Sequence, residues 1–562
     1  MLQFYALTRF FLSHCTVLFR GACGVLILSI ALVATAAPGQ LDPTFGNGSG
    51  YVTTPIGAGL PTGSRVALYP GNKIVVAGSC NIGGTHVFCV ARYQSDGTSD
   101  NTFGQSGIVS LSIGNVDDFL TALLVQANGK VLATGSCGFK PDPLSTSTSY
   151  NFCMVRFDTD GTMDVSFGTN GTVITALDAT NYGRGVATQT DGKLVLAGSC
   201  GDLAPNKFCI ARYFSSGALD VSFGANGKVI TDATGTSAAG VLIQSDQKIV
   251  LFGGCASNGY VEFCARRYLS NGLLDGTFGA NGKVIVATGR QFVLVEGGLL
   301  QADGKIVLSG ACSDVSGQNP VFCLARIATD GQPDPSFGTG GNVVSTVYGD
   351  NGFSVMLQPD GKLVVVGRCS AKRMCLVRYS TDGAIDPTFD GGRVLTQIGR
   401  SAMGYDLVLQ PDGNILASGV CTDEASNLLF CLARYQGGPY LAQACALNAD
   451  ANNTIESSTD ALLILRYLLG YRGDTLTNGA LGANPTRTGA ALETYLASLN
   501  LDVDGDGQAH AMTDGLLILR AMLGLSGNAL TAGAVNTSSP TVRNAQQILT
   551  WIETTHGVAC LP

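Results

Sequence analysis

The chain has 562 residues, enough for a large repeat array together with a smaller domain. Only 13% of the residues are charged, 45% are apolar and 75 are glycine, which is typical of a turn-rich β protein and excludes a disordered chain. The formal net charge of -8 at pH 7 lacks the basic footprint of a nucleic-acid-binding protein, so we expect no nucleic acid partner.

Residues 1–36 have the pattern of a secretory signal peptide. Arg9 and Arg20 supply positive charge, an apolar run follows at 25–33, and residues 34–36 form a small-x-small cleavage pattern. The run is shorter than the roughly 20 residues that a spanning helix needs, which favours a signal peptide over a membrane anchor. We therefore predict a secreted or cell-surface protein with no membrane span after signal removal.

One motif recurs seven times between about residues 41 and 435. In one unit, Asp191-Gly192 marks a tight hairpin turn, and the run at 194–197 is apolar throughout, as in a strand buried on both faces. We place the four strands of this unit near Val173, near Val186, at 193–200 and at 208–213.

Seven such units predict a mainly β fold, a seven-bladed β-propeller of four-stranded repeats over residues 37–438. A β-helix is the alternative, but its repeats are shorter and contain fewer hairpin turns.

The cysteines follow the repeat. Each unit has a close pair whose first member ends one strand and whose second begins the next, so facing residues of antiparallel strands would meet the roughly 5.5 Å Cα spacing of a disulfide. Pairing between blades stays open, because sequence alone does not fix connectivity. Cys445 and Cys560 remain, and we expect them to clasp the ends of the C-terminal region. The close pairs are Cys80/Cys89, Cys137/Cys153, Cys200/Cys209, Cys255/Cys264, Cys312/Cys323, Cys369/Cys375 and Cys421/Cys431.

Each unit also carries one Arg before an aromatic or Ile residue and one Asp shortly before a Phe. A residue needed once for catalysis would not recur in every unit, so we interpret both as framework and predict buried Arg–Asp latches within or between blades. The arginines are Arg92, Arg156, Arg212, Arg267, Arg326, Arg378 and Arg434. The aspartates are Asp42, Asp100, Asp164, Asp220, Asp275, Asp334 and Asp386.

The phrases Leu41-Asp-Pro-Thr-Phe-Gly46, Gln358-Pro-Asp-Gly-Lys-Leu-Val-Val-Val-Gly367 and Leu432-Ala-Arg-Tyr435 resemble the bacterial "delta sixty" β-propeller repeat, over about 41–435. The resemblance implies a propeller in an exported or surface protein and implies no catalytic residues. His86 is the only histidine of the array, and no nucleophile elbow or phosphate loop stands out, so we predict no catalytic residue.

From Cys445 onward the pattern changes to polar loops followed by leucine-rich helices, at 462–469 and again at 516–523. In the second loop, acids at positions 1, 3 and 5, Gly507 at position 6 and a closing acid fit a calcium loop. Its predicted ligands are Asp502, Asp504, Asp506, Gln508 through its backbone carbonyl, and Asp514. Those of the first loop are Asn448, Asp450, Asn452, Thr454 and Asp460. The first loop has two acids against four, so we predict weaker binding there; a solvated acidic turn is the alternative for both.

These paired units resemble the type I dockerin family, over about 445–560, which implies a small all-α, EF-hand-like domain, calcium as cofactor and a cohesin-like partner. Two departures stand out. The closing acid lies at position 13 of each loop where the family has 12, and segments with their own expected helices, 487–499 and 541–553, follow the units.

We therefore predict a secreted, non-catalytic binding or scaffold protein, with a propeller interaction surface and a calcium-binding docking domain at 445–562. The alternative is an extracellular polysaccharide-active enzyme, a glycosidase or lyase. That function would need a non-repeating cluster of acids or tyrosines on the central face of the propeller, which the sequence alone does not identify. A lectin is disfavoured because the sole tryptophan, Trp551, lies outside the array.

Overall fold

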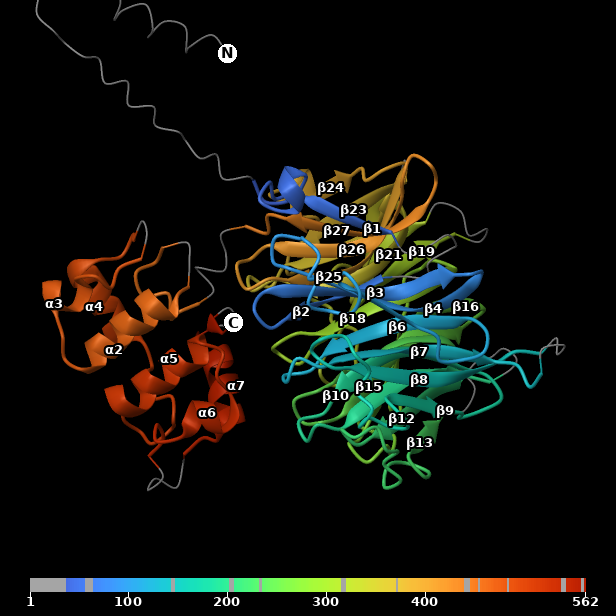
Figure 1. Ribbon diagram of the computed structural model, residues 1–562, viewed down its shortest axis with the longest axis horizontal. Helices are drawn as coiled ribbons and strands as arrows, with labels where there is room; N and C mark the ends of the chain where they lie inside the picture. The colour runs from blue at the N-terminus through green and yellow to red at the C-terminus, as the bar shows by residue number, and fades with distance from the viewer. Residues whose placement is uncertain are drawn as a thin grey trace, which may run out of the picture. The chain divides into compact units, whose positions relative to one another are not determined.

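The computed structural model describes most of the chain beyond the predicted signal peptide, which lies outside the described residues. The described ranges are 37–55, 64–142, 147–201, 207–231, 235–314, 320–369, 372–438, 445–452, 455–482, 485–536, 542–556 and 560–561. Strands occupy the chain from 51 to 435, with two short 3₁₀ turns, η1 (Gly46–Gly48) and η3 (Asp390–Gly392), and helices follow from 457 to 556 (Figure 1). Within these ranges, every helix is too short or too polar to cross a membrane.

Four separate sheets each contain four antiparallel strands. Three of them take four consecutive strands, and the fourth joins the last three strands of the array to the first. Their strands are β2 (Ser64–Tyr69), β3 (Lys73–Ile82), β4 (Thr85–Tyr93) and β5 (Ile108–Leu111); β6 (Asp118–Val125), β7 (Val131–Phe139), β8 (Ser149–Phe157) and β9 (Thr172–Thr175); β10 (Asn181–Thr188), β11 (Leu194–Cys200), β12 (Lys207–Tyr213) and β13 (Lys228–Ile230); and β25 (Ser401–Leu409), β26 (Ile415–Thr422), β27 (Leu428–Tyr435) and β1 (Tyr51–Pro55).

The other eleven strands form one continuous hydrogen-bonded sheet. A single parallel pair, Val261 with Phe292, joins β16 to β18, and the long β21 pairs with β20 through its first half and with β22 through its second. These strands are β14 (Gly235–Ile243), β15 (Ile249–Ser257), β16 (Tyr260–Tyr268), β17 (Lys283–Val286), β18 (Phe292–Leu300), β19 (Ile306–Ser313), β20 (Val321–Ile327), β21 (Asn342–Leu357), β22 (Leu363–Cys369), β23 (Arg373–Tyr379) and β24 (Arg393–Thr396).

The repeated four-stranded pattern confirms a mainly β array, but the predicted grouping of strands is wrong in one respect. The strand near Val173, β9, pairs with β8 of the preceding sheet, and β13 completes the sheet of β10, β11 and β12. The short connection at 176–180 therefore crosses between sheets, whereas the long connection at 214–227 folds back within one sheet. Loop length misleads here because the long connection is held in place by its own turns and by a buried latch.

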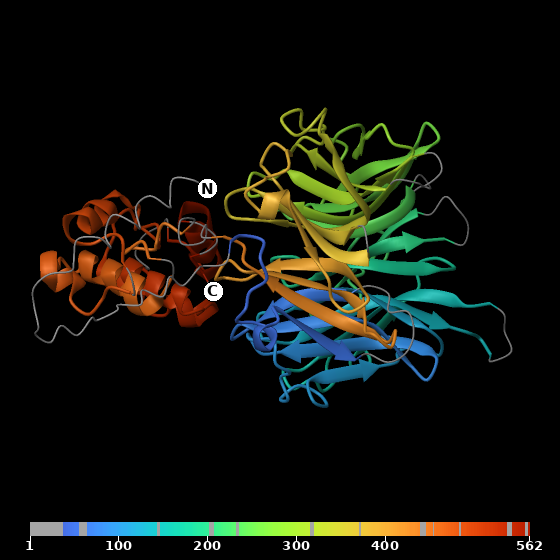
Figure 2. The same ribbon diagram turned by 90° about the horizontal axis from the view of Figure 1, so that it is seen from above.

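The two ends of the array share a sheet. β1 pairs antiparallel with β27, from Tyr51 opposite Ala433 to Pro55 opposite Leu429. The first strand of each four-strand group, here called an inner strand, also contacts the inner strands of the neighbouring groups, and β2 contacts β25 as well as β6. The inner strands therefore form a closed ring: β2, β6, β10, β14, β18, the second half of β21, and β25. Figure 2 shows the two ends of the array, blue and orange, side by side.

All seven predicted Arg–Asp latches form. Each arginine Nε lies 2.6–2.8 Å from an aspartate Oδ2, and both side chains are buried. Each guanidinium also stacks on the ring of a nearby Phe, with 4.4–4.7 Å from its central carbon to the ring centroid. Through Nη1 it donates to a backbone carbonyl of the next unit, as Arg326 does to Thr381 at 2.6 Å. The latch thus ties a strand, the following turn and the next sheet together.

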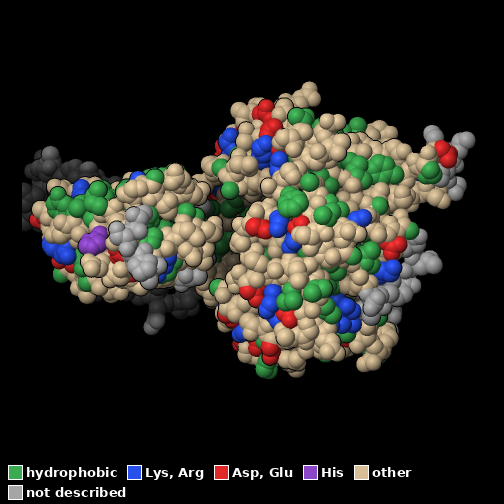
Figure 3. Space-filling view, turned by 90° about the horizontal axis from the view of Figure 1, so that it is seen from below, with side chains coloured by type: hydrophobic (Ala, Val, Ile, Leu, Met, Phe, Trp, Pro, Cys, Tyr) green, Lys and Arg blue, Asp and Glu red, His purple; other side chains and the backbone are tan. Residues whose placement is uncertain are grey.

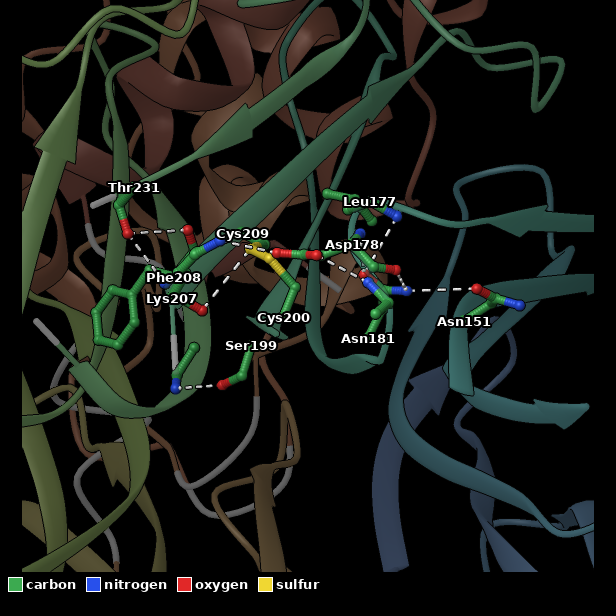
Figure 4. The surroundings of a disulfide bond; sticks show 12 residues. Asn151, Leu177, Asp178, Asn181, Ser199, Cys200, Lys207, Phe208, Cys209 and Thr231 are labelled. Carbon is green, nitrogen blue, oxygen red and sulfur yellow. Dashed lines mark hydrogen bonds and ion pairs between the residues drawn. A yellow bond between two sulfur atoms is a disulfide. The ribbon is translucent and has the colours of Figure 1, made fainter. Parts of the chain in front are cut away.

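Eight disulfides form: the seven close pairs within the repeats, and Cys445–Cys560. In the repeats the Cα atoms lie 5.5–6.0 Å apart. The paired cysteines are diagonal neighbours and not the directly facing residues we expected, since Cys209 faces Gly198 and Cys200 faces Lys207. Strand twist brings such diagonal side chains together. Beside the bridge in Figure 4, the Asn181 amide donates to Asn151 of the preceding sheet at 3.3 Å.

The C-terminal region has its own apolar core, to which its two similar halves both contribute, with Leu463 and Leu517 fully buried. Cys445 and Cys560 join its ends, with Cα atoms 5.0 Å apart. The expected helices at 487–499 and 541–553 are present as α4 and α7. The elements are η4 (Ser457–Ala461), α2 (Leu462–Leu468), α3 (Gly473–Thr477), α4 (Gly489–Ser498), η5 (Ala511–Gly515), α5 (Leu516–Met522), α6 (Gly527–Thr531) and α7 (Ala545–His556).

Candidate metal centre

Three of the predicted ligands meet in the second loop of the C-terminal region. Asp502, Asp504 and Asp514 each offer a carboxylate oxygen, and these three oxygens all lie within 4.8 Å of one another. Asp504 and Asp514 have no exposed surface, and Asp502 is half-buried. Carboxylates converging on one point are the hard oxygen ligands that calcium prefers.

Backbone N–H groups hold these carboxylates in place. Asp514 Oδ1 accepts hydrogen bonds from the backbone nitrogens of Val503 at 2.6 Å and Asp504 at 3.0 Å, and its Oδ2 accepts one from His510 at 2.8 Å. Asp502 accepts from Gly505 at 2.9 Å and from Gly507 at 3.1 Å. The loop therefore fixes its acids before any cation arrives, which lowers the cost of ordering them on binding.

A π-helical turn explains how an acid at position 13 still closes the loop. η5 (Ala511–Gly515) contains a wide turn in which the Gly515 nitrogen donates to the His510 carbonyl at 3.1 Å. This turn takes up one residue more than an α-turn would, so Asp514 reaches the same loop despite its later position. The first loop closes through the equivalent turn, η4 (Ser457–Ala461).

The electrostatics of the second loop favour a bound cation. Burial raises the pKa of the Asp504 carboxyl, and the charges of Asp514 and Asp506 raise it further, against hydrogen bonds that lower it. No Lys or Arg in the described part of the chain forms an ion pair with Asp502, Asp504 or Asp514. Buried carboxylates that repel one another are stabilised most directly by a shared positive ion.

Asp506 and Gln508 lie in the same loop but outside the group of mutually close carboxylates. Asp506 Oδ2 accepts from the Asn536 side-chain amide at 2.7 Å, and its Oδ1 accepts from the Gln508 nitrogen at 2.9 Å. These hydrogen bonds lower the pKa of Asp506. Both residues stay predicted ligands.

The first loop has the same plan with fewer charges. Asp460 Oδ1 accepts from the Ala449 nitrogen at 2.7 Å, and Asp450 Oδ2 accepts from the Gly482 nitrogen at 2.6 Å. The Asn448 amide donates to the Asn452 carbonyl at 2.9 Å. Burial raises the pKa of Asp460 to about 6, and Asp450 adds to the rise. The fifth predicted ligand, Thr454, lies outside the described residues.

Two arginines that support the loops were not identified from the sequence. Arg543 donates to the carbonyls of Asp502 at 2.8 Å and Val503 at 3.0 Å, and its guanidinium lies 4.7 Å from the Trp551 ring centroid. Arg487 does the same for the first loop and stacks on Tyr495. Their regular placement, 39 residues after Asn448 and 41 after Asp502, was the signal that could have found them.

On the face of the array that Figure 3 shows, the described side chains of both charges are mixed. In the space-filling view, Lys and Arg side chains lie interspersed with Asp and Glu (Figure 3). Six of the seven latch aspartates also accept a lysine ion pair, from Lys73, Lys130, Lys193, Lys248, Lys305 and Lys362. These repeated charges therefore belong to the framework.

A family model supports the repeat. Five segments, residues 70–103, 126–167, 189–223, 301–337 and 358–389, match the family described as "Domain of unknown function (DUF5122) beta-propeller". Each segment spans the second and third strands of one group and the following latch turn. The array is thus made of propeller repeats.

Several solved structures resemble the fold at low sequence identity. The polysaccharide lyase Uly1 is 10% identical with a TM-score of 0.42, over 67% of this chain and 90% of that one. The beta-propeller domain of the Trilobed protease from Pyrococcus furiosus is 9% identical with a TM-score of 0.35, over 68% and 98%. The α-L-arabinofuranosidase Arb93A from Fusarium graminearum is 9% identical with a TM-score of 0.33, over 66% and 93%. No curated protein matches the sequence.

Proposed function

We propose that this chain is a secreted, non-catalytic binding or scaffold protein. In this proposal, a seven-bladed propeller supplies a rigid interaction surface, and a dockerin-like C-terminal domain binds calcium and attaches the molecule to a partner. The observation that carries the proposal is the convergence of Asp502, Asp504 and Asp514 on one point.

Seven blades follow if the eleven-stranded sheet is divided at its weak joints. The β16–β18 junction is a single parallel pair, and β21 serves two neighbours with its two halves. Division there gives three further groups of four strands, which with the four separate sheets make seven. The array also contains seven Arg–Asp latches and seven disulfides, one of each for every proposed blade.

The docking role is supported by exposed apolar side chains that recur in both halves of the C-terminal region. Leu469 and Tyr471 follow α2, at 53% and 47% exposed, and Leu523 and Leu525 occupy the same places after α5, at 57% and 37%. Exposed apolar groups clustered in this way are typical of a protein-binding surface. We propose a cohesin-like protein or a cell-surface component as the partner.

Export is supported by the redox chemistry. Eight disulfides are typical of a protein kept in an oxidising compartment, and residues 1–36 have a signal-like pattern. We therefore propose that the mature protein works outside the cytoplasm, either free or at the cell surface.

Calorimetric titration of the mature chain, residues 37–562, with calcium chloride tests the metal site. After treatment with a chelator, we expect two binding events, the tighter one at the second loop. Asp514→Asn should abolish the tighter event, because it removes the one carboxylate that closes that loop. Asp474→Asn, at an exposed acid outside both loops, is the matched control and should bind like the parent protein.

Absence of any calcium heat in the parent chain would refute the site. Loss of binding in both variants alike would show that general surface charge is responsible. Magnesium chloride provides a further comparison, since a flexible multi-carboxylate loop should prefer the larger ion.

A further inference from the structure

Six of the seven inner strands contain a β-bulge at the same level of the ring. The pairing register shifts by one residue just after the position that faces a glycine of the second strand, such as Gly183 facing Gly198. One extra residue is thereby inserted into each strand. The inserted residues are Thr121, Arg184, Ala239, Glu296, Phe353 and Tyr405.

The inserted positions break the repeat. At three of the six bulges, a serine on the second strand of the preceding group accepts the backbone N–H just before the bulge, as Ser136 does from Gly183 at 3.0 Å and Ser199 from Ala238 at 2.8 Å. The inserted residue itself is different in all six strands. Bulges often re-aim side chains next to functional sites, so a level with fixed geometry and varied chemistry points to recognition.

Hydrogen bonds tie this level of the ring together. Arg65 on β2, the inner strand without a bulge, donates through Nε to the Thr121 carbonyl on β6 at 2.6 Å. Its Nη1 lies 3.5 Å from the Tyr405 carbonyl on β25. Thr121 in turn donates to the Gly183 carbonyl on β10 at 2.9 Å. Four inner strands are therefore held in register at the bulges.

Two of the inserted residues, Arg184 on β10 and Glu296 on β18, carry opposite charges at the same level of the ring. The charges of Arg65 and Arg184 both act on Glu296, although β18 is adjacent to neither β2 nor β10. The closed ring of inner strands brings these bulge positions to one level, so the charges of non-neighbouring strands act on a common region. Burial raises the pKa of Glu296, and the two arginines oppose that rise.

The side chains of Arg184 and Glu296 form no hydrogen bond or ion pair in the described part of the chain, although their charges act on each other. Asp406, in contrast, accepts from the Val66 nitrogen at 3.1 Å and from the Ser354 hydroxyl at 2.8 Å, and its charge is offset by Arg65. The cluster therefore presents one free cation and one free carboxylate.

An aromatic pair adjoins these charges. The rings of Phe353 and Tyr405 lie 4.5 Å apart between centroids at an angle of 41°, and Tyr405 lies within electrostatic range of Glu296. Phe353 and Tyr405 are inserted residues of neighbouring inner strands, so the pair exists because of the bulges. Phe353 is 8% exposed and supports Tyr405, whose partly exposed ring is the apolar surface beside the opposite charges.

We propose that this axial cluster binds a small carboxylate-bearing ligand. Arg184 binds the ligand carboxylate, Glu296 accepts hydrogen bonds from a hydroxyl or ammonium group, and Phe353 with Tyr405 packs against the carbon skeleton. A uronic acid and an α-amino acid share this chemistry, and a binding experiment separates them.

The test is calorimetric titration of the mature chain with D-galacturonate, D-glucuronate, L-leucine and L-phenylalanine. The neutral counterparts are D-galactose, D-glucose and the two amino-acid amides. We expect one class of carboxylate to bind and its neutral counterpart to bind at least about tenfold more weakly, because a charge-assisted hydrogen bond is lost. Uronate binding would indicate an acidic polysaccharide as the source, and amino-acid binding a peptide.

Variants locate the site. Arg184→Gln and Glu296→Gln should each weaken binding by about tenfold or more. Arg393→Gln and Glu424→Gln change exposed side chains elsewhere on the array and should leave binding unchanged. The proposal is overturned if no carboxylate binds, if neutral and charged compounds bind equally, or if all four variants bind alike while their circular dichroism spectra match the parent spectrum.

Discussion

The latch between Arg326 and Asp334 gives the sharpest test of how the array is held together. Arg326 is 5% exposed and donates to Asp334 at 2.7 Å, to Ser336 at 2.9 Å and to the Thr381 carbonyl at 2.6 Å. Burial opposes ionisation of Asp334, but its hydrogen bonds with Ser336 and the positive charges beside it bring its pKa well below the usual range. In Asp334→Asn the arginine stays buried without its counter-charge.

The expected cost is about 3–5 kcal/mol, the range for breaking a buried ion pair by removing one partner. Lys305 also contacts Asp334, at 3.2 Å, but its side chain is 31% exposed. Lys305→Met is therefore the matched control, and it should cost no more than about 1 kcal/mol. Asp334→Asn removes the carboxylate that both cations share, whereas Lys305→Met removes only the more exposed cation. The difference between the two costs is therefore the contribution of the buried pair with Arg326.

Guanidinium unfolding of the mature chain measures both effects. Far-ultraviolet circular dichroism follows the β array, while the fluorescence of Trp551, the sole tryptophan, follows the C-terminal region. Asp334→Asn should shift only the dichroism transition. If it shifts that transition no more than Lys305→Met does, the latch contributes little and the reasoning is wrong.

Three further predictions concern other parts of the chain. Asn414 occupies the place where six other units have a lysine. Asn414→Lys should therefore add an ion pair to Asp42 and raise the free energy of unfolding of the array, measured by the dichroism transition, by at most about 1 kcal/mol. Burial lowers the pKa of His556 below 6.5, so the unfolded chain binds more protons than the folded chain below that pH. The free energy of unfolding from the Trp551 transition in saturating calcium should therefore fall as the pH drops from about 6.5, and His556→Phe should flatten this dependence. The disulfide of Cys445 spans 115 residues, and replacing both its cysteines by serine should cost about 5 kcal/mol in the Trp551 transition. Replacing Cys369 and Cys375, whose bridge spans 6 residues of the array, should cost only about 2 kcal/mol in the dichroism transition.

The sequence predicts the array well because its signals are local and repeated. The turn at Asp191-Gly192 and the apolar run after it define β10 and β11 correctly, and the recurrence of Arg212 and Asp220 identifies a buried pair. The grouping of β9 is wrong because strand pairing depends on which connection folds back, and connection length does not record that. Repetition thus specifies the elements but not the boundary at which one sheet ends.

Site residues divide in the same way. Asp502, Asp504 and Asp514 are predicted because a loop places its ligands a few residues apart. Arg184 and Glu296 are not, because they lie 112 residues apart and reach the same level only when the ring closes. The bulge that exposes them inserts a single residue, which changes neither composition nor hydrophobic pattern in a recognisable way.

The two parts of the molecule use one rule. In the array, the arginine latches repeat unchanged, whereas the residues inserted at the bulges vary. In the C-terminal region, Arg487 and Arg543 donate to the two loops in the same manner, whereas the residues at the ligand positions vary. Asn448 and Asn452 in the first loop stand where the second has Asp502 and Asp506, so the first loop has two fewer negative charges. Because Arg487 and Arg543 make matching contacts, we attribute the proposed difference in calcium affinity to charge. Adding two negative charges to the first loop with Asn448→Asp and Asn452→Asp should therefore bring the two loops toward equal affinity.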